Sequence, residues 1–346
     1  MDDLVKNALG IMTLLLVPGI GRKTVSKMLN QISSLPEDPL ELHLLAVNAL
    51  SGSSRYECPS EEEVCFLYER AQKTLSQALS QDIHVLTPLD PQFPTLLKGI
   101  SDPPVILYAK GNLTILDKCC VAVVGRRKPS QYGLDMAKHI GGFLAHEGIV
   151  VVSGLAVGCD QAAHEGCLEN NGETVAVLAH GLDKVYPAQN LHLAGEIVDK
   201  GGCLISEYPP GTKPLAGFFV ERDRLQSGLS SGVIVIEAEA EDGTMHTARF
   251  AVEQGRLLGC LKPPTDVADM QPKVATGNEL LISEGKALPL TSDSDLANML
   301  VISRERWEQL RQLSTRPHSS RKPPCRTEEK NRLLRNFPCE RCMAGL

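Results

Sequence analysis

Aromatic residues and long apolar runs are both scarce in this chain of 346 residues. Aromatics make up 4% of it, with a single Trp, so the core must be built from Leu, Val, Ile and Ala. No apolar run approaches the ~20 residues of a membrane helix, and we expect no membrane partner. The first residues, Met1-Asp2-Asp3, do not resemble the basic start of a signal peptide, so we expect a cytoplasmic protein.

The composition is otherwise ordinary, with 42% apolar and 22% charged residues. These values exclude a fully disordered, collagen-like or coiled-coil chain. Most of the 11 cysteines lie singly in apolar segments, as small buried hydrophobes do in a reducing compartment. One weak zinc pattern ends the chain, but its residues predict disordered thiols, and we expect no metal and no cofactor. They are Cys325, Cys339 and Cys342, with His318 nearby.

The net charge of −7 conceals an asymmetry, because residues 301–346 carry 11 Lys and Arg against 5 Asp and Glu. The rest of the chain is therefore strongly acidic. An acidic body gives no general attraction for nucleic acid, so phosphate binding would need a local site.

Three regions differ in pattern. Residues 1–80 are predicted to form a small all-helical domain, because apolar positions recur at helical spacing. Residues 81–295 are predicted to form an α/β domain that begins with an extended lead-in and a strand at Val105–Tyr108. Residues 296–346 are predicted to be a basic, poorly ordered tail with one short helix around Arg304–Leu313. The helical segments of the first region are Leu14–Leu29, Leu40–Leu50 and Val64–Leu79.

Short β-branched runs alternate with amphipathic stretches between residues 119 and 290. This alternation predicts a Rossmann-like doubly wound, mainly parallel sheet, with ligands beyond the carboxyl ends of the strands. The predicted strands are Val121–Val124, Ile149–Val152, Thr174–Leu178, Cys203–Ile205, Gly232–Ile236 and Leu257–Leu261. The predicted helices are Tyr132–His146, Asp160–Asn170, Gln189–Lys200 and Thr247–Gln254.

A glycine-rich turn separates the first two helical segments. Gly19 and Gly21 can present backbone N–H groups to a phosphate, and Lys23 begins the next helix. The pattern is similar to a helix-hairpin-helix, so we predict a secondary DNA contact here. The alternative is a plain tight turn within a packing module.

Two further candidate sites follow predicted strands. Gly125, Arg126 and Arg127 precede a helix that starts near Ser130, and a helix N-terminus beside arginine favours phosphate. Neither G-x-G-x-x-G nor G-K-[ST] occurs there, so a standard dinucleotide or P-loop site is not supported.

The second site is the loop at Ser153, Gly154, Leu155 and Ala156, which can form a nest of N–H groups. Asp160 can cap the following helix and pair with His164 one turn later.

The remaining candidates combine aromatic and basic residues, a combination that suits stacked bases and phosphates. Lys213 follows a Pro/Gly-rich loop, and Phe219, Arg222 and Arg224 come next. Thr244 stands at a turn before a helix, although the acids near it oppose an anion. The alternative for the segment that holds Phe219, Arg222 and Arg224 is a core Phe with solvated arginines.

Taken in order, these segments resemble the DprA/Smf family, the DNA-processing proteins of bacterial natural transformation. The resemblance covers about Leu89 to Leu290. It rests on Asp90–Pro94, Leu107–Gly111, Val123–Ser130, Ser153–Ala156, Gly181–Pro187 and Ser206–Gly211. It implies a non-enzymatic, dimeric protein that binds single-stranded DNA, protects it and helps to load the recombinase RecA.

The resemblance also implies site residues. Arg127 stands at the Arg of the family's first turn, and Phe219, Arg222 and Arg224 match its Phe-Pro-x-Arg-Asn-Arg segment. The chain departs from the family pattern at Arg126, Val157, Glu221, Asp223 and Asp242–Thr244. Most of these exchanges lower positive charge, so we expect weaker DNA binding or an altered ligand. The alternatives are a nucleotide-binding sensor and a nucleotide hydrolase on the same Rossmann frame.

Overall fold

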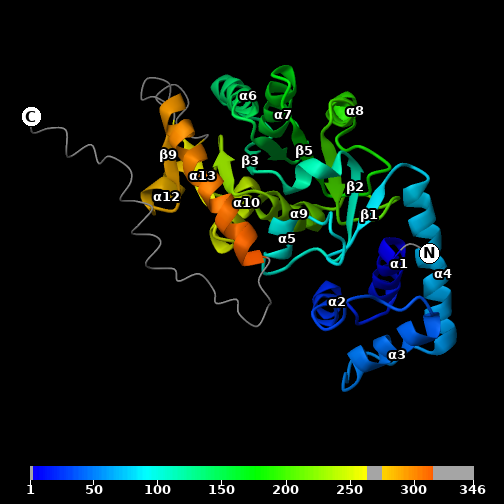
Figure 1. Cartoon of the computed structure of the whole chain (residues 1–346). Helices are drawn as coiled ribbons and strands as arrows, with labels where there is room; N and C mark the ends of the chain where they lie inside the picture. Colours follow the sequence, from blue (N-terminus) through cyan, green and yellow to red (C-terminus); the bar gives the residue numbers. More distant parts are fainter. Residues whose placement is uncertain (1–2, 263–274, 315–346) are drawn as a thin grey trace, which may run out of the picture. The chain divides into compact units, whose positions relative to one another are not determined.

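A computed structural model describes residues 3–262 and 275–314 of the chain (Figure 1). The first region is helical, as predicted, and the break at the glycine-rich turn divides the first segment into two helices. A capping box at Ser60 and Glu63 fixes the start of the longest helix in this region. The helices are α1 (Asp3–Leu16), α2 (Arg22–Leu29), α3 (Pro39–Leu50) and α4 (Glu61–Leu79).

The second region is built on a nine-stranded sheet in the order β1-β2-β6-β5-β4-β3-β7-β8-β9. Strands β1, β2 and β6 pair antiparallel at one edge, and the other pairs are parallel. The α/β class and the mainly parallel sheet are therefore confirmed. The strands are β1 (His84–Leu86), β2 (Leu107–Gly111), β3 (Cys120–Val124), β4 (Val150–Ser153), β5 (Thr174–Leu178), β6 (Cys203–Ser206), β7 (Gly232–Val235), β8 (Leu257–Leu261) and β9 (Leu288–Leu290).

Helices cover both faces of the sheet. Side chains alternate along a strand, so Val121 of β3 packs with α6 while Ala122 packs with α9 and α10. Both faces of β3 are buried, which explains its continuous apolar run. Helices α6 (Gln131–His146), α7 (Cys159–Glu169) and α8 (Leu191–Asp199) lie on one face, and α9 (Ala216–Leu229), α10 (Thr244–Glu253) and α12 (Thr276–Ser283) on the other. Short elements α5 (Thr95–Lys98), η1 (Leu113–Asp117) and η2 (Ala188–Asn190) lie in the connections.

The end of the described chain differs from the prediction. Helix α13 spans Asp293–Ser314, well beyond the short helix expected at Arg304–Leu313. Leu296, Met299 and Leu300 are buried in the core that also holds α6. Residues 296–314 therefore pack onto the α/β region and are not part of a poorly ordered tail. The predicted thiols of the tail lie outside the described residues.

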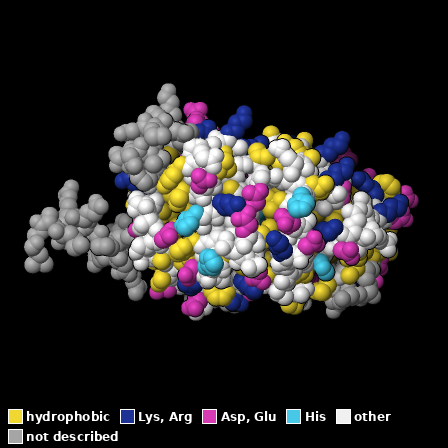
Figure 2. Space-filling model, turned by 90° about the horizontal axis from the view of Figure 1, so that it is seen from above, with side chains coloured by type: hydrophobic (Ala, Val, Ile, Leu, Met, Phe, Trp, Pro, Cys, Tyr) yellow, Lys and Arg dark blue, Asp and Glu magenta, His cyan; other side chains and the backbone are white. Residues whose placement is uncertain are grey.

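Charged side chains of both signs are intermixed over the surface seen in Figure 2, without a broad basic field. Within residues 3–262 and 275–314, no helix is long and apolar enough to cross a membrane. On this face, a phosphate site would therefore have to be a local feature.

Candidate nucleic-acid interface

Two adjoining cavities lie beyond the carboxyl ends of the central strands. The first, of about 380 Å³, is bordered by the loops after β3 and β7 and by α9 and α10. The second, of about 390 Å³, is bordered by the loops after β4 and β5. Arg127, Ala156 and Phe219 line both, and we call the pair of cavities the groove. The chain reverses its direction across the sheet between β3 and β7, which is where doubly wound sheets bind ligands.

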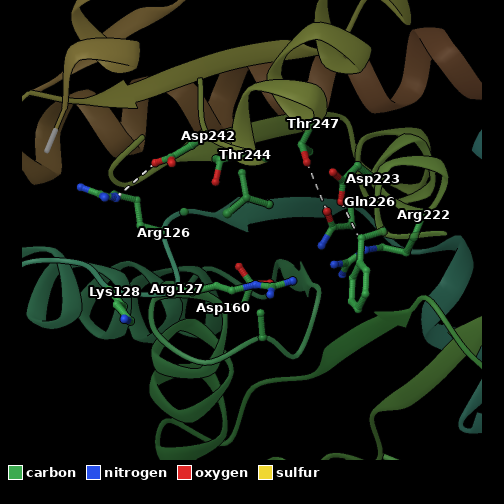
Figure 3. Close-up of a pocket in the computed structure, with 15 residues that line it drawn as sticks. Arg126, Arg127, Lys128, Asp160, Arg222, Asp223, Gln226, Asp242, Thr244 and Thr247 are labelled. Atoms are coloured by element: carbon green, nitrogen blue, oxygen red, sulfur yellow. Dashed lines mark hydrogen bonds and ion pairs between the residues drawn. The ribbon is translucent and has the colours of Figure 1, made fainter. Parts of the chain in front are cut away.

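The loop after β3 presents two exposed cations to the first cavity, Arg127 and Lys128 (Figure 3). Gly125 allows this loop to pass α7 closely, since a Cβ there would lie 2.6 Å from Cys159 Sγ. No carboxylate of the described residues forms an ion pair with either cation. The Arg127 guanidinium lies 5.2 Å from the centre of the Phe219 ring, a cation–π distance. These two cations therefore remain available to an anion.

Arg126, the neighbouring cation, differs because carboxylates pair with it. Its Nη1 lies 2.8 Å from Glu239 and its Nε lies 3.2 Å from Asp242, both in the loop after β7. The side chain is 20% exposed and lines the first cavity. Carboxylates compensate its charge, so adjacent arginines of one predicted motif do not contribute equally.

The start of α6, predicted to hold a phosphate, is occupied by a carboxylate of the chain. Ser130 caps the helix, and its Oγ accepts from the Gly133 amide at 2.9 Å. Glu237 accepts from the Ser130 amide at 2.9 Å and is hydrogen-bonded to its hydroxyl. A helix N-terminus attracts any anion, and here Glu237 is that anion. The side chains of the loop, not the helix end, are left for a ligand.

In the loop after β4, polar groups that could bind an anion are also bonded to other groups of the protein. Ser153 is buried and donates from Oγ to the Val123 carbonyl at 2.6 Å. Leu155 is buried with a φ of 57°. The Gly154 amide donates to Asp160 Oδ2 at 3.1 Å, so the predicted nest holds this carboxylate. Of this loop, Gly154, Ala156 and Val157 line the groove.

Asp160 and His164 do not form the predicted pair. His164 Nδ1 lies 2.7 Å from Thr174 Oγ1, while Asp160 is bound by the amide of Gly154. Burial, aided by the positive charge of Arg222, lowers the pKa of His164 to about 3, so the imidazole is neutral. Both residues are structural, and Asp160 also forms part of the wall of the first cavity.

Helix α9, which the sequence pattern did not predict, carries four residues to the first cavity. They are Phe219, Arg222, Asp223 and Gln226, whose spacing puts them on one helical face. The Phe219 ring also lies 5.9 Å from that of Tyr186 in the second cavity. Arg222 is buried beneath the cavity, and its Nη1 donates to the Val177 carbonyl at 2.8 Å.

Arg224 is not brought to the groove. Two residues along a helix correspond to about 200° of rotation, so Arg224 faces away from the side on which Arg222 lies. Its Nη2 lies 2.6 Å from each carboxylate oxygen of Glu207, and its Nε lies 3.6 Å from Asp102. Arg22 reaches the same Asp102, with its Nε 3.0 Å from Oδ1. We call these four residues the buried cluster after its centre, since Arg224 and Glu207 are 5% and 10% exposed, whereas Arg22 and Asp102 are each 27% exposed.

Two carboxyl groups in the wall of the first cavity, Asp160 and Asp223, have raised pKa values. Burial, with the like charge of Asp160, raises the pKa of Asp223 to about 7 against the opposing effect of Arg222 and Arg127. Burial also raises the pKa of Asp160, although Arg222 opposes this. The cavity therefore holds a carboxyl group that can change its charge near neutral pH.

Of the other predicted residues, some line the groove and some lie outside it. Thr244 begins α10 and lines the first cavity, whereas Lys213 is exposed on the loop before α9, outside both cavities. Gly19 and Gly21 lie in the turn between α1 and α2, Lys23 lies in the first turn of α2, and their predicted DNA contact stays a prediction. Sequence reasoning missed several lining residues. They are Asp223, Gln226, Asp242 and Thr247 in the first cavity and Tyr186–Gln189 in the second. Position after β5 and β7 was the signal that could have found Asp242 and the Tyr186 segment.

Comparison with known proteins identifies the family of this chain. The family model described as DNA recombination-mediator protein A matches residues 84–301. The chain is 39% identical over 197 residues to the DNA processing protein DprA of Bacillus subtilis, which is 57% of this chain and 66% of that protein. The aligned part spans 52–66% of the curated relatives from Bacillus subtilis, Escherichia coli and Synechocystis.

Solved structures extend the likeness to the fold. The X-ray structure of DNA processing protein A from Streptococcus pneumoniae superposes with a TM-score of 0.68 at 32% identity, over 84% of this chain and 95% of that one. DNA processing protein A from Helicobacter pylori, whose structure concerns its single-stranded DNA binding mode, superposes with a TM-score of 0.56 at 30% identity, over 63% and 95%. The matched residues include the sheet, the loops after β3 and β4, and α9. This chain belongs to the DNA recombination-mediator protein A family, also known as DprA/Smf.

Proposed function

We propose that the protein binds single-stranded DNA in the groove, protects the strand and helps to load a RecA-type recombinase. The observation that carries this proposal is that one groove holds aromatic rings beside cations that form no ion pair with a carboxylate of the described residues. Arg127 and Lys128 supply charge, and Phe219 and Tyr186 supply rings. Cations that follow the backbone and rings that stack on bases are the two requirements for binding a single strand.

Two positions that could bind a phosphate of the strand are occupied by carboxylates of the protein itself. Glu237 occupies the start of α6, and Asp160 occupies the loop after β4. Phosphates are therefore contacted by side chains, mainly Arg127 and Lys128. With few phosphate contacts, affinity should be moderate and its salt dependence shallow. The Helicobacter pylori relative, whose single-stranded DNA binding mode has been described, supports a strand as the ligand.

A titration of a labelled, unstructured oligonucleotide of mixed sequence by fluorescence anisotropy tests the binding step. We expect salt-dependent binding, and we expect Arg127→Ala to weaken it about tenfold on all sequences alike and to lower the salt slope by about one. Arg249→Ala is the matched control. It removes an exposed arginine that pairs with Glu253 on α10 outside the groove. Equal affinities for both variants, or no binding at low salt, would overturn the proposal.

The mediator step is tested separately. We measure ATP hydrolysis by RecA on DNA coated with single-strand-binding protein, with and without this protein. We expect the protein to shorten the lag before hydrolysis, and we expect most of the lag to return when the Arg127→Ala variant is used.

Sedimentation of the same samples tests the expected homodimer. Free nucleotides that displace the strand at low concentration would instead favour a nucleotide sensor.

A further inference from the structure

Exposed lysines outside the groove continue its cations along one edge of the sheet. The parallel strands β3, β4, β5 and β6 lie side by side, so their carboxyl ends share this edge. Arg127 and Lys128 follow β3, Lys184 follows β5 and Lys213 follows β6. No carboxylate of the described chain forms an ion pair with Lys184 or Lys213. With adjacent strands about 4.8 Å apart, these cations are spread over three strand spacings, about 14 Å.

The loops that carry the two lysines are bonded to each other. The Gly211 amide donates to Asp183 Oδ1 at 2.7 Å, and the Gly181 amide donates to the Thr212 carbonyl at 3.1 Å. Each lysine directly follows one of the bonded residues, so these bonds fix the backbone of both lysines at the edge. The carboxylate of Asp183 is also engaged within the protein by its hydrogen bond.

Aromatic rings link the groove to the loop after β6. Phe218 directly precedes Phe219, the ring that the two cavities share. The ring of Phe218 stacks on that of Tyr208, with 4.1 Å between their centres. Tyr208 belongs to the loop after β6, and both rings are partly exposed. Rings therefore continue from the groove toward β6, beside the lysines.

Helix α2 lies at the far end of this series of contacts. Nη1 of Arg22, its first residue, lies 3.6 Å from Oε1 of Glu207, which directly precedes Tyr208. Lys23 comes next and is exposed, and it forms no ion pair with a carboxylate of the part of the chain that the structure describes. A Cβ at Gly21 would meet nothing within 4 Å, so the turn before the helix is open to a ligand.

Carboxylates beside this edge are mostly bound within the protein. Glu207 pairs with Arg224 at 2.6 Å, and Asp102 pairs with Arg22. Glu221 differs, because it is exposed and its Oε2 accepts from the Tyr208 hydroxyl at 3.0 Å. Glu221 therefore opposes a phosphate on this path, while the lysines attract one.

We propose that a single strand held in the groove continues along this edge of the sheet, past the loop after β6, to Lys23 of α2. We call Lys184, Lys213 and Lys23 the lysine track. The inference rests on the proposed function, since it names where the strand runs after it leaves the groove. The lysines contact phosphates, and bases lie against the stacked rings of Phe218 and Tyr208. The helical region thus takes part in binding.

The experiment compares oligo-dT strands of about 6 and about 20 nucleotides by fluorescence anisotropy at several salt concentrations. The short strand can occupy the groove alone, whereas the long strand can also reach the lysine track. We expect wild type to bind the long strand more tightly. Its salt slope should also be steeper, because each phosphate contact on a single strand adds about 0.7.

Lys23→Gln removes the cation at the far end of the lysine track and leaves the groove unchanged. We expect affinity for the long strand to fall about threefold to fivefold and its salt slope to fall by about 0.7. Affinity for the short strand should not change. Lys73→Gln is the matched control, because it removes an exposed lysine of α4 in the same helical region. It should alter neither strand.

Glu221→Gln should have the opposite effect. It removes the exposed negative charge beside Tyr208, and its amide oxygen can still accept from the hydroxyl. We expect affinity for the long strand to rise about twofold and affinity for the short strand to change less. Thermal unfolding of every variant verifies that it is folded.

The outcomes separate the lysine track from the groove. If Lys23→Gln and Lys73→Gln behave alike on both strands while Arg127→Ala weakens both, the track is overturned and binding in the groove stands. A loss in Lys23→Gln that is equal for the two strands would also overturn the track, because the change would then act on the groove itself. If wild type binds neither strand at low salt, the proposed function itself fails.

Discussion

The groove and the buried cluster both contain arginines of recognisable sequence motifs, but Arg127 of the groove and Arg224 of the cluster differ in whether a carboxylate pairs with them. In the groove, Arg127 and Lys128 are exposed and unpaired with any carboxylate of the described residues. In the buried cluster, the Arg224 side chain is 5% exposed and bound to Glu207. The comparison teaches that an arginine in a nucleic-acid-binding pattern says little by itself. Helix phase and the placement of carboxylates decide whether its charge reaches a ligand.

The two regions also have different tasks. The buried cluster joins α2, the segment before β2, the end of β6 and α9 through Arg22, Asp102, Glu207 and Arg224. Because α9 carries Phe219, Arg222 and Asp223 into the groove, the cluster sets the position of the groove wall from behind. Altering the cluster should therefore affect stability, whereas altering the exposed cations should affect binding alone.

The largest effect should follow from removing one partner of the buried cluster. Glu207→Ala leaves Arg224 buried without its main carboxylate, and we expect the free energy of unfolding to fall by about 3–5 kcal/mol. Urea denaturation measures it. Glu196→Ala, which removes an exposed carboxylate near Lys200 on α8, should change stability by less than about 1 kcal/mol. Equal small changes in both variants would show that the cluster is not the structural element described above.

A smaller effect concerns the carboxyl group on the groove side of α9. The pKa of Asp223 is raised by burial from 3.8 to about 7, so the folded protein holds a proton that the unfolded chain releases. The stability from this proton is fully present below about pH 4 and is lost as the pH rises through 7. Relative to wild type, Asp223→Asn should gain on the order of 1–3 kcal/mol between about pH 5 and pH 8.

Urea denaturation at a series of pH values measures this difference. Asp135→Asn on the exposed face of α6 serves as the control, and its curve should run parallel to that of wild type. Parallel curves for Asp223→Asn as well would show that Asp223 titrates normally in the folded protein.

The sheet was the most predictable part of the molecule. Thr174–Leu178 and Leu257–Leu261 are strands with the predicted ends, because strands buried on both faces leave short apolar runs bounded by turns. Helix α9 was missed for the opposite reason. Its second half, residues 222–229, is buried on all sides and rich in polar residues, so it has no apolar stripe for a periodicity argument to detect.

The candidate site was predictable in its cations but not in their partners. Arg126 and Arg127 adjoin a predicted strand end, and both line the first cavity. The carboxylates that distinguish them, Glu239 and Asp242, come from a loop more than a hundred residues later and meet Arg126 only in the folded sheet. No local pattern could have shown that Arg126 pairs with two carboxylates while Arg127 forms no ion pair with a carboxylate of the described residues.

The smallest expected effect tests the contrast between the paired Arg126 and its neighbour Arg127. Asp242→Asn removes one of the two carboxylates that hold Arg126, while an Asn oxygen can still accept from the Glu239 amide as Asp242 does at 2.9 Å. Arg126 should then resemble Arg127 more closely. We expect affinity for single-stranded DNA to rise about twofold to threefold, with a slightly steeper salt slope. The increase stays small because Glu239 continues to pair with Arg126.

Anisotropy titrations at two salt concentrations measure this gain, and the second variant Arg126→Ala/Asp242→Asn decides its cause. If the released guanidinium contacts the strand, the double variant should lose the gain and fall below wild type. If the gain survives in the double variant, it comes from the lost negative charge alone. In that case compensation of Arg126 does not distinguish it from Arg127, and the contrast between paired and unpaired cations within the groove would not hold.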